Sequence, residues 1–302
     1  MLIAMTGSGG FVGQALARRL ARRGHTVVPI SREPGLLPRV DAVVHLAGEP
    51  IGGRWTARRR RAILESRIDL TRRLVDRMRD SGDPPRVFLS ASGTGIYGDR
   101  PGETLTEESA PGCGFRTDVC LAWEAEAARA RCLGIRTALL RFGAILHPSG
   151  GILARLLPWH RRGLSFILGG RQDPFPWIGL SDAVSLAQFC LEEPVAGPVN
   201  GVSPERVTQE EFARLLAASE GRRLCGRIPG RGLRWLLGEM ARAIIDRQEV
   251  WPEKALGLGF VFCETLVSAC LGREEAGTGD PIPGPRSAAP SGYSMPYSRS
   301  LL

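Results

Sequence analysis

Three glycines near the start of the chain have the spacing of a phosphate-binding turn. Gly7, Gly10 and Gly13 stand between an apolar run, residues 2–5, and an amphipathic run that ends at Gly24. The first two glycines permit a tight turn and close approach of the backbone to a pyrophosphate, and the third permits close helix–strand packing. The helix N-terminus then attracts the phosphates. The pattern predicts a dinucleotide site, against the alternative of a glycine-rich turn without a ligand.

The residues that end the second predicted strand, 25–31, bear on which dinucleotide binds. An acidic residue here binds the ribose 2′-hydroxyl of NAD. In this chain Ser31 and Arg32 come first and Glu33 follows. An arginine pairs with the 2′-phosphate of NADP, whereas a carboxylate repels it. We therefore expect NADP(H) to be favoured over NAD(H). The alternative is that Arg32 is a surface residue and Glu33 binds the ribose.

Strand-like and helix-like segments alternate along the first two thirds of the chain. The strands are expected at 2–5, 25–31, 41–48, 85–92 and 135–146, with a short one near Val199, and the main helices at 14–24, 56–79, 117–133 and 178–192. This alternation is typical of a parallel sheet that is covered by helices on both faces. We expect an α/β protein with a Rossmann-type, doubly wound sheet and a small, mostly helical C-terminal part.

The sequence suggests three regions. Residues 1–205 form the predicted NADP-binding Rossmann domain, with 150–178 contributing to the substrate side. Residues 206–272 form a small C-terminal module, which opens on a capping-box pattern at Thr208. Residues 273–302 are rich in Pro, Gly and Ser without apolar periodicity, and we expect a disordered tail.

Charge and cysteine usage limit the possible partners. The net charge is +9, and ten arginines fall between Arg54 and Arg79. Nucleic-acid binding by this run remains an alternative, but aromatic interleaving and a nucleic-acid motif are both missing, which favours a solvated helix. The scattered cysteines and histidines have no metal-site spacing. No apolar run is long enough for a membrane span and no secretory signal is evident, so we expect a cytoplasmic protein that forms no membrane contact. A homodimer is the candidate assembly, because homodimers are common among symmetric soluble proteins.

Several segments together resemble a known family. They are TGSGGFVG at 6–13, HLAGE at 45–49, LSASGTGIYG at 89–98 and RFGAIL at 141–146. These resemble the extended short-chain dehydrogenase/reductases, which are Rossmann-type enzymes related to nucleotide-sugar epimerases. The further segments PFPWIGLSD at 174–182, GPVNGVSP at 197–204 and VTQEEFARLLA at 207–217 resemble one atypical, epimerase-like subgroup with a small C-terminal module. The resemblance covers about residues 1–272.

The resemblance carries an important departure. The family at large works by a Tyr-x-x-x-Lys pair, in which the lysine lowers the tyrosine pKa for proton transfer. The only lysine of this chain is Lys254, and Val250 stands four residues before it. The pair is therefore missing, as it also is from the atypical subgroup. Ser92, Thr94 and Tyr97 remain as candidate catalytic residues, although an unperturbed tyrosine pKa near 10 makes a poor base and Tyr97 is also interpretable as a pocket wall.

These observations give a set of expected cofactor-binding residues and two functions. The resemblance adds Arg67, on the helix after HLAGE, as a residue expected to reach the cofactor. The expected set is Gly7, Ser8, Gly10, Phe11, Val12, Gly13, Ser31, Arg32, Leu46, Ala47, Gly48, Glu49 and Arg67. The first function is an NADP-dependent oxidoreductase or sugar-nucleotide epimerase-like enzyme with an unknown substrate. The alternative is a catalytically inactive, NADP(H)-sensing regulatory protein.

Overall fold

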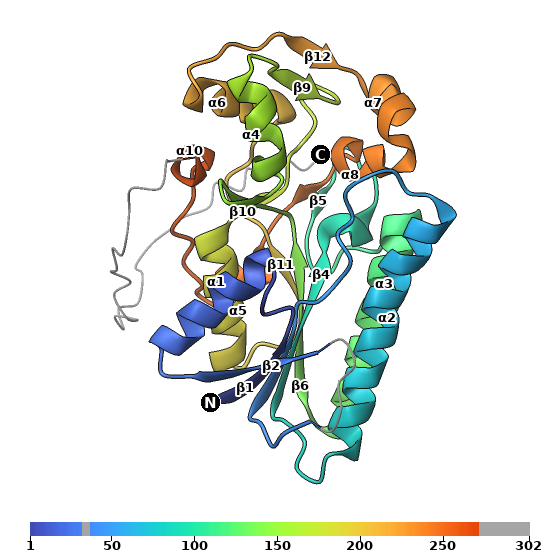
Figure 1. Cartoon of the computed structure of the whole chain (residues 1–302), viewed down its shortest axis with the longest axis vertical. Helices are drawn as coiled ribbons and strands as arrows, with labels where there is room; N and C mark the ends of the chain where they lie inside the picture. The colour runs from blue at the N-terminus through green and yellow to red at the C-terminus, as the bar shows by residue number, and fades with distance from the viewer. Residues whose placement is uncertain (32–36, 272–302) are drawn as a thin grey trace, which may run out of the picture. The chain divides into compact units, whose positions relative to one another are not determined.

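A parallel six-stranded sheet forms the centre of the protein (Figure 1). The computed structural model describes residues 1–31 and 37–271. Across the sheet the order is β2 (Thr26–Ile30), β1 (Leu2–Thr6), β3 (Ala42–His45), β4 (Val87–Gly93), β6 (Arg136–Phe142) and β11 (Gly197–Gly201). Every neighbouring pair is parallel. The predicted Rossmann-type sheet is confirmed.

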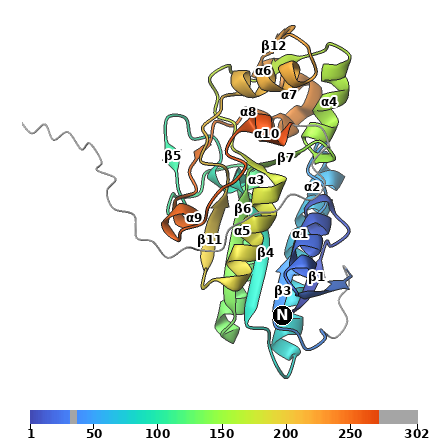
Figure 2. The ribbon, with the colours of Figure 1, turned by 90° about the vertical axis from the view of Figure 1, so that its left-hand side faces the viewer.

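Helices cover both faces of the sheet (Figures 1 and 2). On one face lie α1 (Phe11–Arg22) and α5 (Leu180–Glu192), and on the other lie α2 (Ala57–Asp80) and α3 (Phe115–Ala128). Alternate strand residues supply the two cores, because successive side chains of a strand point to opposite faces. Ile3 and Met5 pack in the core with α1 and α5, whereas Ala4 packs in the core with α2.

The strand order reverses at β1. The chain passes from β1 to β2 on one side and then returns across β1 to β3 on the other. The ends of β1 and β3 therefore diverge toward helices on opposite faces, which opens a crevice between them. In open α/β sheets, ligands bind at such a switch point, beyond the carboxyl ends of the strands.

The remaining elements are short and lie mostly beyond the carboxyl ends of the strands, at the top of Figure 1. They are η1 (Thr94–Tyr97), β5 (Thr104–Leu105), η2 (Arg129–Leu133), β7 (Ala144–His147), β8 (Gly150–Gly151), α4 (Leu153–Arg161), β9 (Phe166–Leu168), β10 (Trp177–Gly179), α6 (Gln209–Ser219), β12 (Gly226–Ile228), α7 (Gly230–Leu237), η3 (Gly238–Ala241), α8 (Arg242–Ile245), β13 (Glu249–Val250), α9 (Glu253–Gly257) and α10 (Val267–Cys270). The C-terminal part is mostly helical, as expected.

Two expected elements are divided. The run 135–146 forms two strands, because at Gly143 the chain leaves the main sheet and β7 pairs with β10 instead. A β-carbon at Gly143 would lie 2.6 Å from the carbonyl oxygen of Pro176, so this crossing requires glycine. The expected helix 117–133 ends at Ala128 and continues as the 3-10 turn η2.

The C-terminal part shares its core with earlier segments. Leu146 and Trp177 pack in one cluster with Phe212 and Leu216. Met1–Gly272 forms one compact unit, and the predicted tail 273–302 lies outside the described residues. The division at residue 205 stays a proposal.

The edge of the sheet opposite the crevice carries the chain's one lysine. Lys254 lies on α9, and its amine donates a hydrogen bond to the carbonyl oxygen of Ala196, 3.2 Å away, just before β11 begins.

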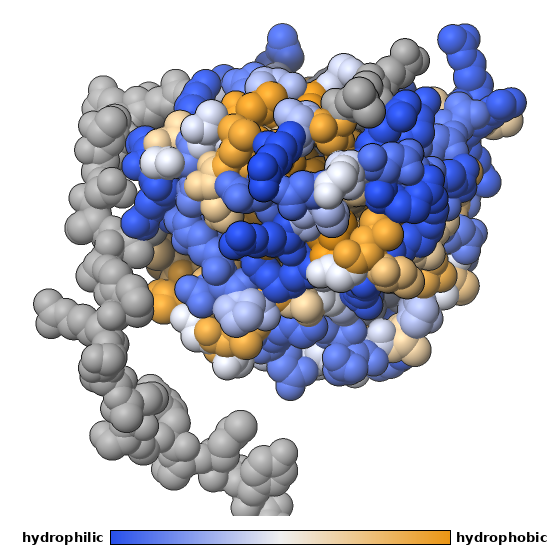
Figure 3. All heavy atoms as spheres, turned by 90° about the horizontal axis from the view of Figure 1, so that it is seen from below, coloured by the Kyte–Doolittle hydropathy of each residue, from blue (hydrophilic) through white to orange (hydrophobic). Residues whose placement is uncertain are grey.

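The face seen from below is largely hydrophilic, with small separate hydrophobic patches (Figure 3).

Candidate functional site

The glycine turn links β1 to α1 in the predicted manner. Gly7 has φ +73°, and a β-carbon there would lie 2.8 Å from the amide nitrogen of Ala47. A β-carbon on Gly13 would lie 2.0 Å from the carbonyl oxygen of Gly7. Both positions therefore require glycine for the close packing of α1 on β1. At Gly10 the helix begins without a side-chain cap, which leaves the N–H groups of its first turn available to an anion.

A recess of about 190 Å³ opens beside this turn. It lies between the carboxyl ends of β1 and β3, at the switch point of the sheet. Its lining brings together five of the expected cofactor residues with two others, Thr6 and Ile30. The lining residues are Thr6, Gly7, Gly10, Ile30, Leu46, Ala47 and Gly48. Ser8, Phe11, Val12 and Gly13 follow in the same turn and the start of α1, although they are not part of this lining.

Arginines from α2 hold the segment that follows β3. Arg67 donates a hydrogen bond to the carbonyl oxygen of Glu49 at 2.9 Å, and its guanidinium packs against Gly48. The Glu49 carboxylate forms an ion pair with Arg59 at 2.7 Å. Burial lowers the pKa of Arg67, a change that nearby Cys120 and Glu49 oppose. Glu49 is therefore engaged by its backbone and side chain, and Arg67 lies directly behind the recess.

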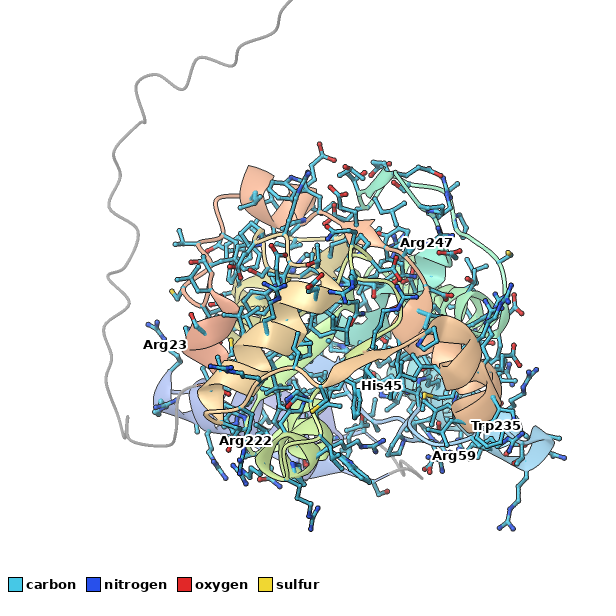
Figure 4. All side chains as sticks on the ribbon, turned by 90° about the horizontal axis from the view of Figure 1, so that it is seen from above. Arg23, His45, Arg59, Arg222, Trp235 and Arg247 are labelled. Atoms are coloured by element: carbon cyan, nitrogen blue, oxygen red, sulfur yellow. The ribbon has the colours of Figure 1, made fainter. Side chains whose placement is uncertain are left out.

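His45 is the last residue of β3 and lies near the middle of the view in Figure 4. Its Nδ1 is 2.7 Å from the hydroxyl oxygen of Thr6, and its ring meets Trp123 edge-on at 5.9 Å. Burial, and secondarily the charge of Arg67, lowers the His45 pKa to about 3. The imidazole is therefore neutral at physiological pH. It acts as a packed strand residue.

The residues at the end of β2 are only partly described. Ser31 is exposed and directly follows Ile30, which lines the recess. Arg32 and Glu33 lie outside the described residues. The preference for NADP therefore stays a prediction from the sequence.

The three candidate catalytic residues lie at the end of β4 (Ser92) and in the η1 turn that follows (Thr94 and Tyr97), and all are buried. The Ser92 hydroxyl donates a 2.6 Å hydrogen bond to the Glu124 carboxylate. Thr94 is 3% exposed. Tyr97 is fully buried, and its hydroxyl donates to Asn200 at 2.7 Å. Burial raises the Tyr97 pKa against the lowering effects of its polar partners, which makes it a weaker proton donor than a free tyrosine. Their catalytic roles stay hypotheses.

A buried polar network joins these residues, and the sequence did not indicate it. Arg141, on β6, forms a two-point ion pair with Glu124, with both contacts at 2.9 Å, and donates to the Tyr97 hydroxyl at 2.9 Å. Burial disfavours the charged form of Arg141, but its bonds to Glu124 outweigh burial and raise its pKa. The only available signal was an arginine between the apolar run 138–140 and Phe142 of β6.

Helix α3 contains no tyrosine and no lysine, and it presents other polar groups. Arg116 packs against Gly95 and lies 3.4 Å from the carboxylate of Asp246 on the C-terminal side. Burial raises the Asp246 pKa, although neighbouring arginines oppose that shift. One turn later, the Cys120 thiol donates to the carbonyl oxygen of Gly93 at 3.6 Å, and burial raises its pKa. This surface therefore offers a cation, a carboxyl and a protonated thiol.

A second, much smaller hollow of about 10 Å³, which holds about one water molecule, adjoins Arg116. It is formed by the start of α3 together with the C-terminal turns η3 and α8. Its lining residues are Trp55, Cys113, Gly114, Phe115, Arg116, Thr117, Glu239, Arg242 and Asp246. The expected substrate-side segment 150–178 is absent from this lining, which instead includes part of the C-terminal module.

Two features are absent from the described residues. Within 1–31 and 37–271, no three His, Cys, Asp or Glu residues gather as a metal-binding group. In the same residues, no helix combines the length and apolar character needed to cross a bilayer.

Solved structures share this architecture. The human epimerase family protein SDR39U1 (isoform 2), crystallised with NADPH, matches with a TM-score of 0.84 and 29% identity, covering 90% of this chain and 98% of that chain. MoeE5, in complex with UDP-glucose and NAD, matches with a TM-score of 0.74 at 21% identity over 90% of this chain and 96% of its own. The second likeness concerns the fold alone.

Curated sequences and a family model extend this similarity. The epimerase family protein YfhF of Bacillus subtilis is 33% identical over 285 residues, which cover 87% of this chain and 94% of that protein. Human SDR39U1 is 31% identical over 291 residues, which cover 90% and 98%. The model of the NAD dependent epimerase/dehydratase family matches residues 3–203, which contain the glycine turn, the recess and the buried network. The chain therefore belongs to the NAD dependent epimerase/dehydratase family.

Proposed function

We propose that the protein binds NADP(H) in the recess between β1 and β3 and acts as an epimerase-like oxidoreductase. The observation that carries this proposal is the recess itself, which combines a glycine-only turn, an open helix N-terminus and small residues at the end of β3. Gly7 and Gly10 allow a pyrophosphate to approach the backbone. Ala47 and Gly48 leave room for the dinucleotide to lie across the sheet.

The preference for NADP has two supports. Arg32, just after β2, matches the demand of a 2′-phosphate for a cation. The human relative with 29% identity was crystallised with NADPH. The more distant MoeE5 was crystallised with NAD, so the fold itself serves both dinucleotides.

The remaining chemistry is proton transfer beside the nicotinamide end. The bound dinucleotide supplies or accepts the hydride. Ser92 already donates to a buried carboxylate, Glu124, so a proton that leaves the Ser92 hydroxyl has a neighbouring acceptor. Such a pair is able to replace a tyrosine in general acid–base catalysis when its geometry fits the substrate. Thr94 lies two residues further along the same turn.

A second candidate function is an NADP(H)-sensing protein without turnover. It is favoured by the buried state of Tyr97 and by the Arg116–Asp246 contact at the start of α3. In that case the nucleotide changes a partner interaction. The two functions share the cofactor site and differ only in the chemistry beyond it.

Calorimetric titration with NADPH and NADH tests the cofactor site. We expect the wild-type protein to bind NADPH and Gly7→Ala to lose binding, because a β-carbon there would lie 2.8 Å from the amide nitrogen of Ala47, just after β3. Gly9→Ala is the matched control, since a β-carbon at Gly9 meets nothing within 4 Å. Wild-type protein that binds neither dinucleotide at millimolar concentration would exclude the proposal.

A turnover assay separates the two candidate functions. NADPH consumption and NADP⁺ reduction are followed with panels of carbonyl compounds, alcohols and nucleotide sugars, and nucleotide-sugar isomers are separated by chromatography. The enzyme proposal predicts turnover that Ser92→Ala reduces while NADPH affinity stays unchanged. Tight NADPH binding with no turnover across the panels favours the sensing protein.

A further inference from the structure

The turn that leads into α4 lies over the start of α1. A β-carbon on Gly150 would lie 2.2 Å from the ring of Phe11, the first residue of α1, and one on Gly151 would lie 3.3 Å from the same ring. His147 completes this contact, with its ring centre 6.3 Å from that of Phe11. Two glycines therefore let the chain press against Phe11, which brings the beginning of α4 beside the phosphate-binding turn.

From this position, Arg155 of α4 reaches the loop that follows β3. A β-carbon on Gly52 would lie 1.8 Å from Nη1 of Arg155 and 2.7 Å from the central carbon of its guanidinium. A glycine at residue 52 is thus what makes room for the guanidinium. Gly48, four residues earlier on the same loop, lines the recess. Arg155 consequently links α4, whose preceding turn contacts Phe11, to the loop after β3, in which Gly48 lines the recess.

Among the described residues, no acidic side chain forms an ion pair with Arg155. Its backbone N–H donates to the carbonyl oxygen of Ile152, whereas its guanidinium donates no hydrogen bond to any of the described residues. Arg59 also reaches Gly52, but it is neutralised by Glu49 at 2.7 Å. Arg161, further along α4, is neutralised by Glu220 at 3.2 Å. An exposed arginine that is held near an anion site and lacks an acidic partner is suited to bind that anion.

We propose that Arg155 is a pyrophosphate-binding residue that faces the glycine turn across the recess. This rests on the proposed binding of a dinucleotide. The turn offers backbone N–H groups from one side, and Arg155 offers a planar guanidinium from the other, which matches phosphate oxygens in two-point hydrogen bonds. No element of the glycine pattern predicts this residue, because it lies more than 140 positions away in the sequence.

Calorimetric titration of Arg155→Ala with NADPH and with NADH tests the assignment. Because both dinucleotides carry the pyrophosphate, we expect their affinities to fall by a similar factor, about tenfold. Arg155→Lys keeps the charge but not the two-point geometry, and we expect an intermediate loss. Arg162→Ala is the matched control, since Arg162 is an exposed arginine at the end of the same helix, and it leaves both affinities unchanged.

Each outcome separates this inference from the proposed function. If the wild type binds both dinucleotides and Arg155→Ala binds them equally well, the inference is wrong and the cofactor site stands. A loss confined to NADPH assigns Arg155 to the 2′-phosphate and overturns the pyrophosphate role. Wild-type protein that binds neither dinucleotide overturns both proposals. Circular dichroism and thermal unfolding of each variant identify any loss that comes from misfolding.

Discussion

We expect the choice between the two dinucleotides to depend on Arg32, two residues after Ile30, which lines the recess. We expect Arg32→Ala to reduce the ratio of NADPH affinity to NADH affinity about tenfold, or about 1.4 kcal/mol, since only NADPH carries the 2′-phosphate. Titration of both dinucleotides measures this ratio. Arg23→Ala is the control, because Arg23 points outward at the end of α1 (Figure 4). An unchanged ratio in Arg32→Ala would refute the assignment.

His45 predicts a specific dependence of stability on pH. Its pKa is about 3 in the folded protein and ordinarily near 6.5, so the unfolded chain binds the proton first as the pH falls. Its contribution to folding is therefore complete above pH 6.5 and is lost as the pH falls toward 3. Between pH 7 and pH 5 this amounts to about 2 kcal/mol. Urea unfolding at intermediate pH values measures it.

The control for this pH effect is His45→Asn. Asparagine keeps a hydrogen-bonding group near Thr6 but gains no proton in this range. The variant is expected to be less stable at pH 7 and to lose less stability on acidification. Parallel pH curves for the two proteins would show that His45 does not cause the effect.

At the level of elements, hydrophobic patterning was sufficient to predict the sheet and its main helices. The strands are short and mostly apolar, and Gly7 and Gly13 mark the first strand–helix turn. The prediction of one strand over 135–146 was wrong, because the apolar pattern continues across Gly143. There the chain passes close to the backbone of Pro176 and leaves the main sheet, and no local pattern marks that contact.

The polar network behind β4 could not be predicted, because its members are brought together by the fold rather than by local spacing. Tyr97 and Asn200 bond across 103 positions of the chain. Glu124 and Arg141 come from a helix and a strand whose pairing no local pattern specifies. The same reasoning applies to Asp246, which reaches Arg116 from the C-terminal module.

The Glu124–Arg141 pair gives a prediction for α3 and β6. Each single variant, Arg141→Leu or Glu124→Leu, leaves a nearly buried charge without its partner, and we expect a loss of about 3–5 kcal/mol of unfolding free energy. The double variant removes both charges and is expected to lose less than the sum of the two. Urea unfolding of the four proteins forms a double-mutant cycle. Additive losses would contradict a direct pairing energy.

At the scale of the whole molecule, the segment 206–271 completes the core of the earlier residues. Phe260 and Phe262 pack in the same core as α1 and α5, and Phe212 stacks on Phe175 with ring centres 4.1 Å apart. A chain cut after residue 205 exposes these contacts. We expect residues 1–205 to lack cooperative thermal unfolding, whereas residues 1–271 retain it. Cooperative unfolding of 1–205 near the midpoint of the longer chain would identify an autonomous domain.

The position of Lys254 has a practical consequence for all of these titrations. Because it is the chain's only lysine, an amine-reactive fluorophore has a single side chain to acylate. The amine lies beside Ala196, where β11 begins, whereas the recess lies where β1 and β3 end. A reporter dye on this amine is therefore attached to one defined side chain at the edge of the sheet away from the recess, where we expect it not to obstruct nucleotide binding.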